Sequence, residues 1–311
     1  MADQPSGARS VETAEMAPPL GQYHEVEGRR LYLHSSGSGG PSVVFLAGGG
    51  TVGLDYWNVH EQAAQLTTSV VYDRAGTGWS SGVGLPRSSA EVTDELRQLL
   101  RTAGIPGPYL LVGHSLGGLY ARHYATRFAD EVAGLVLLDP AHEDYNAYMP
   151  QQLVEQWEAW DPDQAMPEEL PDEVVQLYRG LFAEELADWP QQLRDLLIDR
   201  HVSPGWLRVG FQEAKNVKEL YAEMRDAGPL PDVPLIVLSS MAVDSFKAAV
   251  SQGTPESLMR EEIDGKRKLY TALAASVPRG EIRLVDGTGH ATFHFRRPDA
   301  VLQAIEDLLG R

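Results

Sequence analysis

Residues 109–118 read YLLVGHSLGG, in which four apolar or aromatic residues lead into Gly-His-Ser-Leu-Gly. The apolar run predicts a buried strand, and the residues that follow it predict a helix. A G-x-S-x-G pattern between a strand and a helix is a nucleophile elbow, a sharp turn that exposes the serine hydroxyl. Gly113 and Gly117 are needed because a side chain at either position would collide with the strand or the helix. Ser115 is therefore the candidate nucleophile.

Short β-branched runs alternate with segments of helical period on both sides of this stretch, which is the sequence form of parallel β-α-β units. Helices are expected after the capping-box pattern at Ser88 and from Pro298. Because crossovers between parallel strands are right-handed, the chain is predicted to be an α/β protein with a doubly wound sheet. Strands are expected at residues 42–47, 69–73, 109–113, 134–139, 235–239 and 281–285.

The regular spacing breaks after Asp139, and residues 142–231 carry helical stretches and four of the six tryptophans. One interpretation is a satellite helical layer with its own small core. The other is a cap or lid, because insertions at strand carboxyl ends tend to lie above the ligand crevice. The predicted organisation is a flexible tail (1–20), a core domain (21–141 and 232–311) and a helical lid (142–231).

Composition excludes several classes of function. The chain has 26 basic and 44 acidic residues and a net charge of −18, so binding to nucleic acid or to an anionic membrane is not expected. No stretch approaches the roughly 18 apolar residues of a membrane span, and residues 1–20 lack the pattern of a signal peptide. A cytoplasmic protein is expected, and its oligomeric state stays open. Without cysteine there is no thiolate nucleophile or Cys-based metal site, and neither a metal nor a cofactor is expected.

A glycine-rich segment, GGGTVG at residues 48–53, fits the G-x-G-x-x-G fingerprint of dinucleotide binding, with Asp73 at the end of the next strand. An NAD-dependent oxidoreductase is therefore one alternative. An extended segment at residues 23–34 already precedes the motif, although the fingerprint normally opens the sheet. Residues 54–57, LDYW, are bulky where packing at a pyrophosphate turn favours small side chains.

A nucleophilic serine needs a base, and nine histidines are available. His290, in GTGH at residues 287–290, follows the last predicted strand and precedes the final helix. It is therefore expected at the same sheet edge as Ser115. His114 is expected to point elsewhere on the turn. The other histidines considered are His123 inside the helix and the loop residues His142 and His294.

The carboxylate that orients the base has two candidates. Asp139 ends the strand after the elbow and is followed by a proline, whereas Asp244 follows the next strand on a loop without glycine. We favour Asp139 because its position at a strand end leaves it less freedom. Otherwise Asp139 would be a turn cap and Asp244 a solvated loop charge.

An acyl transfer also needs donors for the oxyanion. The N–H of Leu116, directly after the nucleophile, is one candidate. The second is expected from the loop after the strand at 42–47, where we choose Gly49, because glycines let the backbone approach a ligand. The glycine segment thus serves equally well as an oxyanion loop.

The order of glycine loop, YDRAGTGWS at residues 72–80, GHSLG at 113–117 and the pair Gly289-His290 resembles the α/β-hydrolase superfamily, over residues 22–310. The resemblance implies a mostly parallel, eight-stranded sheet with a helical lid between the sixth and seventh strands. It also implies an acid after the seventh strand, but the usual spacing from glycine to aspartate is missing there. Some lipases instead take their acid from a Leu-Asp-Pro-Ala segment after the sixth strand, which residues 138–141 match.

The function that follows is a serine hydrolase that cleaves a carboxylic ester of a small, apolar substrate through an acyl-enzyme on Ser115. A lactone, a thioester and acyl transfer stay open. The tryptophans of residues 142–231 indicate an apolar or aromatic group in the substrate. The alternative from another class, besides the oxidoreductase, is a non-hydrolytic small-molecule binding protein on the same fold.

Overall fold

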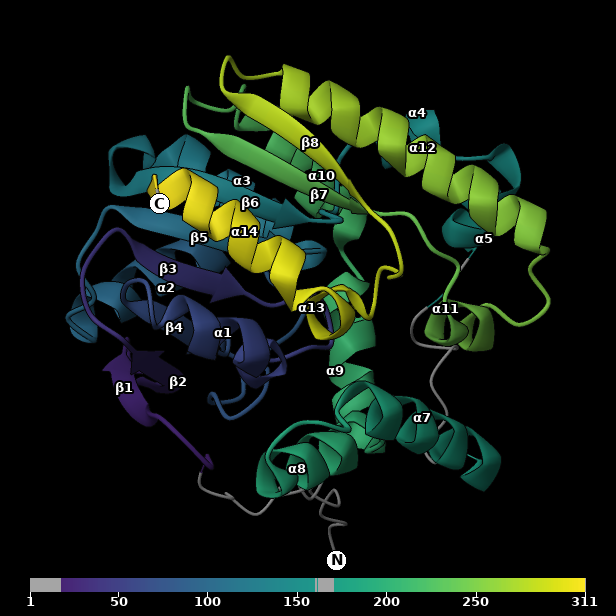
Figure 1. Cartoon of the computed structure of the whole chain (residues 1–311), viewed down its shortest axis with the longest axis horizontal. Helices are drawn as coiled ribbons and strands as arrows, with labels where there is room; N and C mark the ends of the chain where they lie inside the picture. The colour runs from purple at the N-terminus through teal and green to yellow at the C-terminus, as the bar shows by residue number, and fades with distance from the viewer. Residues whose placement is uncertain (1–17, 160, 162–170, 311) are drawn as a thin grey trace, which may run out of the picture.

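The computed structural model describes residues 18–159, 161 and 171–310, and its centre is one eight-stranded sheet (Figure 1). The strand order is β1-β2-β4-β3-β5-β6-β7-β8. Strand β2 is antiparallel to both of its neighbours, and the pairs from β4 to β8 are parallel. The predicted mostly parallel sheet is confirmed. The strands are β1 (Gln22–Val26), β2 (Arg29–Ser36), β3 (Ser42–Leu46), β4 (Ser69–Tyr72), β5 (Tyr109–His114), β6 (Val132–Leu138), β7 (Leu235–Ser240) and β8 (Gly280–Val285).

Helices cover both faces of the sheet, which is why its central strands are apolar on both sides. In β3, Val43 and Phe45 belong to the buried cluster that holds α1 and α14, while Val44 and Leu46 belong to the cluster that holds α2, α3 and α12. The doubly wound arrangement is thus confirmed. The covering helices are α1 (Trp57–Ala63), α2 (Ser89–Thr102), α3 (Leu116–Arg127), α12 (Glu256–Ala275) and α14 (Pro298–Leu309).

Helices α2 and α14 begin where the local sequence predicts. The Ser88 hydroxyl accepts from the N–H of Glu91 at 3.2 Å, and the Glu91 carboxylate accepts from the N–H of Ser88 at 2.9 Å, so the predicted capping box starts α2. Helix α14 begins at Pro298 and ends at Leu309, and the next residue, Gly310, caps it with a left-handed φ of 71°. Within the described ranges, no helix has both the length and the apolar character of a membrane span.

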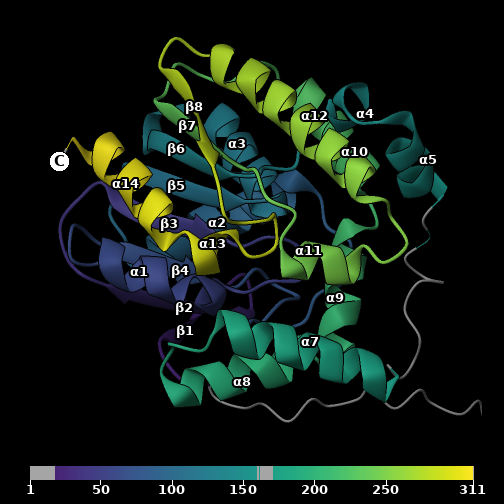
Figure 2. The ribbon, with the colours of Figure 1, turned by 45° about the vertical axis from the view of Figure 1, so that its right-hand side comes forward.

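The described part of the chain between β6 and β7 is mostly helical. Figures 1 and 2 show α7, α8 and α9 grouped beyond the end of the sheet where the parallel strands finish. The buried residues of this segment join the two clusters that cover the sheet: Leu220 joins that of α3, and Leu197 joins that of α1. The boundaries of the lid stay a prediction, and residues 1–17, 160 and 162–170 lie outside the described part. The described helices are α4 (Tyr145–Tyr148), α5 (Gln151–Ala159), α7 (Asp172–Glu185), α8 (Gln191–His201), α9 (Pro204–Ala214) and α10 (Val217–Asp226).

The strand order places two loops side by side. The chain leaves β3 for β4 on one side and returns to β5 on the other, so the loops after β3 and β5 diverge from neighbouring strands. Leu46 pairs with Gly113 at the ends of these strands. Such a switch point opens a crevice at the carboxyl ends of the strands. The glycine loop and Ser115 therefore share one crevice.

Candidate active site

Ser115 stands on a strained turn between β5 and α3. Its backbone has φ 51° and ψ −120°, a left-handed conformation that is rare for a residue with a side chain. The turn is fixed because the N–H of Ser115 donates to the carbonyl of Leu138 at 3.0 Å. A Cβ on Gly113 would lie 2.6 Å from the carbonyl oxygen of Gly117, and one on Gly117 would lie 2.0 Å from that of Leu46. Both glycines are needed for the reason that the sequence indicates.

The structure brings Ser115, His290 and Asp139 together. His290, on the loop between β8 and α13 (Phe293–Arg296), has Nε2 3.1 Å from Ser115 Oγ. Its Nδ1 lies 3.3 Å from Oδ2 of Asp139. With Nδ1 protonated, the ring donates to the carboxylate and Nε2 can accept the serine proton. This is the geometry that a general base requires.

Asp139 is a buried carboxylate with several donors. It also has a left-handed φ of 41°, and it accepts from the N–H of Ser240 at 2.9 Å and from the Ser240 hydroxyl at 2.5 Å. Nζ of Lys266, on α12, donates to Asp139 Oδ2 at 2.9 Å. Burial alone would raise the pKa of Asp139, but the Lys266 ammonium and the hydrogen bonds from His290 and Ser240 hold it well below its usual range. Asp139 is therefore ionised at neutral pH.

Asp244 has a different role in the structure. It is buried, and its carboxylate accepts from the N–H of Gly289 at 2.8 Å and from the Thr292 hydroxyl at 2.5 Å. It also caps α11 (Ser245–Val250) by accepting from the N–H of Lys247 at 2.8 Å. Its interpretation as a solvated charge is wrong, because it ties down the loop that carries His290. Among the described contacts, Asp139 and not Asp244 touches the imidazole.

His114 links two parts of the site through its hydrogen bonds, a role that the sequence does not indicate. The N–H of Gly48 donates to Tyr56 Oη at 3.3 Å, and Tyr56 Oη lies 2.8 Å from His114 Nδ1. His114 Nε2 is 2.9 Å from the carbonyl oxygen of His290, to which it must donate. Burial and the nearby His290 lower the pKa of His114 to about 3, so its ring is neutral. A chain of hydrogen bonds thus joins the glycine loop to the backbone of His290.

The expected oxyanion donors lie beside Ser115. Gly49 and Leu116 line the same cavity as Ser115. Among the described hydrogen bonds, neither backbone N–H donates to another group of the protein. A Cβ on Gly49 would meet nothing closer than 3.6 Å, so this glycine is not required by sterics. The two N–H groups are free to bind an oxyanion.

The glycine segment does not fit a dinucleotide. Asp73, which the fingerprint would place on a ribose, is buried and accepts from the N–H groups of Gly53 and Trp79, each at 2.8 Å. The N–H of Gly50 is also engaged, because it donates to Glu213 Oε2 at 3.0 Å. Asp73 and the N–H of Gly50 are thus bound within the protein, where a dinucleotide would need them.

Two cavities meet at Ser115 and His290. One, of 320 Å³, has an aromatic lining that includes Phe182, Phe211, Phe246 and Phe295. The other, of 630 Å³, is more polar and includes Lys266, Glu262, Tyr145, Tyr221 and Tyr270.

The tryptophans of residues 142–231 contribute little to these linings. Only Trp157 among those described lines either cavity, whereas Trp189 is buried against Phe295 and Trp206 donates to the carbonyl of Gly50 at 3.0 Å. The aromatic lining of the smaller cavity comes mainly from phenylalanines.

Three side chains of the kinds that bind metal ions lie close together, but away from Ser115. Within the described ranges, His34, His60 and Glu61 could approach one ion, but they lie on β2 and α1 and line neither cavity. His60 is buried with Nδ1 2.8 Å from Ser69 Oγ and packs 5.1 Å from the ring of His34. The cluster is separate from Ser115.

Comparison with known proteins gives consistent matches. The sequence model described as "Alpha/beta hydrolase family" matches residues 43–304. Cfl2 from Burkholderia cenocepacia aligns with a TM-score of 0.66 at 20% identity, over 92% of this chain and 94% of Cfl2. The enol-lactonase from Burkholderia xenovorans LB400 aligns with a TM-score of 0.56 at 20% identity, over 93% and 100% of the two chains. At these identities the structural likeness shows the fold alone.

Curated relatives match over shorter stretches. Human (Lyso)-N-acylphosphatidylethanolamine lipase is 36% identical over 104 residues, which is 32% of this chain and 30% of the lipase. YqjL of Bacillus subtilis is 35% identical over 111 residues, or 36% of this chain and 44% of YqjL. The chain thus spans less than half the length of these relatives.

The elbow and the oxyanion loop should differ in their tolerance of a methyl group. Gly117→Ala is expected to lower the free energy of unfolding by about 3 kcal/mol or more, because its Cβ would overlap the Leu46 carbonyl. Gly49→Ala should cost less than about 1 kcal/mol, since its Cβ meets only ordinary contacts. Urea unfolding followed by tryptophan fluorescence measures both, and equal losses would contradict the elbow geometry.

Proposed function

Since the chain belongs to the alpha/beta hydrolase family, we propose that it is a serine hydrolase that cleaves a carboxylic ester of a small molecule through an acyl-enzyme at Ser115. The observation that carries the proposal is the pair of contacts of His290, 3.1 Å to Ser115 Oγ and 3.3 Å to Asp139 Oδ2. A serine that touches a base is the arrangement that activates a hydroxyl.

The reaction has two steps. In the first, Ser115 Oγ attacks the ester carbonyl carbon while His290 Nε2 takes the serine proton, and the N–H groups of Gly49 and Leu116 bind the oxyanion. The intermediate collapses by breaking the bond to the alcohol, which leaves with the proton from His290. In the second, water gives a proton to His290 and attacks the acyl-enzyme, and Ser115 leaves as the hydroxyl. Asp139 stabilises the imidazolium in both steps.

The two cavities suggest how an ester would lie. The phenylalanine-lined cavity of 320 Å³ suits an alkyl or aromatic group, and the larger cavity offers hydrogen-bonding tyrosines to the other half of the molecule. Residues of α9 and α10, such as Gly210 and Tyr221, line these cavities, which supports a lid role for the helices after β6. The named activities of a lactonase and a lipase among the similar proteins agree with an ester or lactone bond.

An activated serine can be detected directly. Incubation with a fluorophosphonate should add one probe mass to the wild-type protein and none to Ser115→Ala, as measured by intact-protein mass spectrometry. Ser276→Ala, which removes an exposed hydroxyl at the end of α12, should still be labelled. A folded wild-type protein that takes no probe and hydrolyses no ester would favour a non-hydrolytic binding protein.

The two candidate acids give different kinetic effects. Asp139→Asn should lower kcat for ester hydrolysis by about 10³- to 10⁴-fold, because the amide cannot stabilise the imidazolium. Asp244→Asn should lower kcat by less than about tenfold, since this side chain binds the loop and not the imidazole. Steady-state kinetics on p-nitrophenyl esters compares them, and the opposite ranking would make Asp244 the acid.

Lys266 should stabilise the fold through the charge of Asp139. Its ammonium helps to hold the pKa of Asp139 well below the usual range, so the pair contributes stability at neutral pH that is lost as Asp139 becomes protonated in acid. Lys266→Met leaves the buried carboxylate without its cation and should lower the free energy of unfolding by about 3 kcal/mol at pH 7, with a smaller loss at lower pH. Lys268→Met, which removes an exposed charge from the same helix, is the control. Urea unfolding measures both variants, and equal stability at pH 7 would show that the pair does not stabilise the fold.

A further inference from the structure

Arg74, which follows β4, binds the backbone of the glycine loop, residues 47–53. One guanidinium nitrogen of Arg74 donates to the carbonyl of Ala47 at 2.5 Å, and another donates to that of Gly48 at 2.9 Å. The Thr51 hydroxyl also donates to the Gly48 carbonyl, at 3.1 Å. Two successive carbonyls of the loop therefore point toward the guanidinium.

The contact between Arg74 and the Gly48 carbonyl also fixes the direction of the Gly49 N–H, because the peptide bond that joins the two groups is planar and trans. The carbonyl of Gly48 and the N–H of Gly49 belong to one planar unit and point in opposite directions. Since the carbonyl is bound by Arg74, the N–H of Gly49 is directed away from Arg74. Gly49 is one of the residues that line the cavity beside Ser115.

Helix α9 holds the other side of the loop. Glu213 Oε2 accepts from the N–H of Gly50 at 3.0 Å, while its Oε1 accepts from Arg74 Nε at 2.9 Å and Nη2 at 2.8 Å. Trp206 Nε1 donates to the carbonyl of Gly50 at 3.0 Å. Glu213 and Arg74 are 6% and 3% exposed, so solvent does not compete for their contacts. One carboxylate thus binds the loop and the arginine that orients it.

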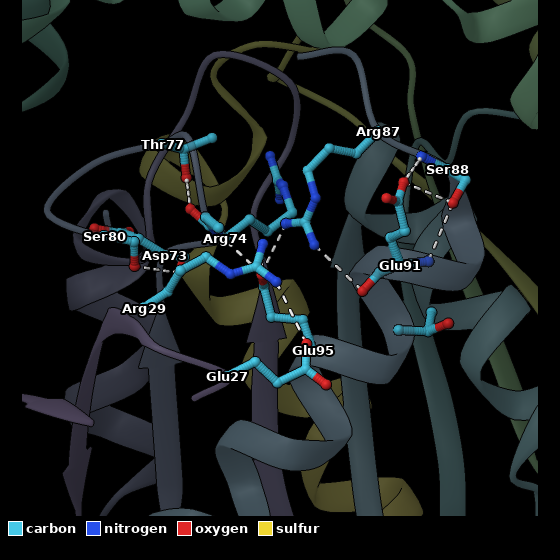
Figure 3. Close-up of polar contacts among 12 residues, drawn as sticks. Glu27, Arg29, Asp73, Arg74, Thr77, Ser80, Arg87, Ser88, Glu91 and Glu95 are labelled. Atoms are coloured by element: carbon cyan, nitrogen blue, oxygen red, sulfur yellow. Dashed lines mark hydrogen bonds and ion pairs between the residues drawn. The ribbon is translucent and has the colours of Figure 1, made fainter. Parts of the chain in front are cut away.

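Glu213 is the carboxylate that pairs with Arg74, because the nearby Glu95 pairs with other arginines. Figure 3 shows Arg74 near Arg87, which pairs with Glu95 at 2.9 Å. Arg29 approaches Glu95 as well, at 3.7 Å. In the described part of the chain, the ion pair of Arg74 is with Glu213.

The loop and α9 also approach without side chains between them. Gly50 has a left-handed φ of 69°, and a Cβ on it would lie 3.1 Å from the Cα of Gly210. A Cβ on Gly210 would lie 2.9 Å from the Cα of Gly50. Small residues on both sides let α9 come close enough for its carboxylate to reach the loop.

We propose, on the basis of the hydrolase function proposed above, that Glu213 and Arg74 are positioning residues that aim the Gly49 N–H at the oxyanion. Glu213 fixes the guanidinium and the Gly50 N–H, and the guanidinium fixes the Gly48 carbonyl. Oxyanion stabilisation in the core therefore depends on a carboxylate supplied by a helix inserted between β6 and β7. The effect belongs to the transition state, because the donor acts on charge that develops there.

The test compares Glu213→Gln with Glu219→Gln, which makes the same change at an exposed position of α10. In Glu213→Gln, kcat for p-nitrophenyl esters should fall by about 10- to 100-fold while KM stays within about threefold. Glu219→Gln should match the wild type. A loss confined to KM, or equal kcat in the two variants, would overturn the proposal.

A second variant removes a contact without unpairing Arg74. Trp206→Phe keeps an aromatic ring but loses the bond to the Gly50 carbonyl, so kcat should fall in the same direction with KM little changed. This variant decides the question if Glu213→Gln does not fold. An unchanged kcat in Trp206→Phe would then contradict the proposal.

Hydrogen–deuterium exchange separates this proposal from the proposed function. Peptides that cover residues 47–53 should exchange faster in Glu213→Gln than in Glu219→Gln, whether or not the protein hydrolyses an ester. If the wild type has no hydrolase activity, the proposed function is wrong. The exchange rates then still test whether Glu213 holds the glycine loop in place. Equal exchange in the two variants would show that Glu213 does not hold the loop.

Discussion

The contact between Gly117 and the end of β3 is the constraint on which the site depends. A Cβ at Gly117 would lie 2.0 Å from the carbonyl of Leu46, so α3 begins against the backbone that leads into the glycine loop. This contact is possible because β3 and β5 are neighbours at the switch point of the sheet. This backbone contact consequently brings Ser115 close to the glycine loop.

Around this backbone, the buried carboxylates are paired with cations or accept hydrogen bonds from backbone N–H groups. Asp139 faces Lys266, Glu213 faces Arg74, and Asp73 accepts two backbone N–H groups. A buried charge is tolerated when it is paired and hydrogen-bonded. The same pairs orient the groups near Ser115, because Asp139 holds the imidazole of His290 and Arg74 holds a peptide of the glycine loop.

Site residues could be predicted from the sequence where they directly follow a strand, because the end of a strand fixes their place at the sheet edge. Ser115, Asp139 and His290 all follow strands, and parallel strands end at one edge, so their meeting could be predicted. The partners on helix faces could not. Lys266 is 127 residues from Asp139, and Glu213 is 139 residues from Arg74. No local pattern marks them, because which face of a distant helix packs on a loop depends on the tertiary fold.

In the proposed mechanism, a covalent acyl group forms on Ser115 during turnover. The direct measurement is rapid acid quench of a reaction with p-nitrophenyl acetate, followed by proteolysis and peptide mass spectrometry. We expect an added acetyl group on the peptide that contains Ser115, which disappears once the substrate is consumed. An acetyl group that stays on another residue, or turnover without any acylated peptide, would contradict an acyl-enzyme at Ser115.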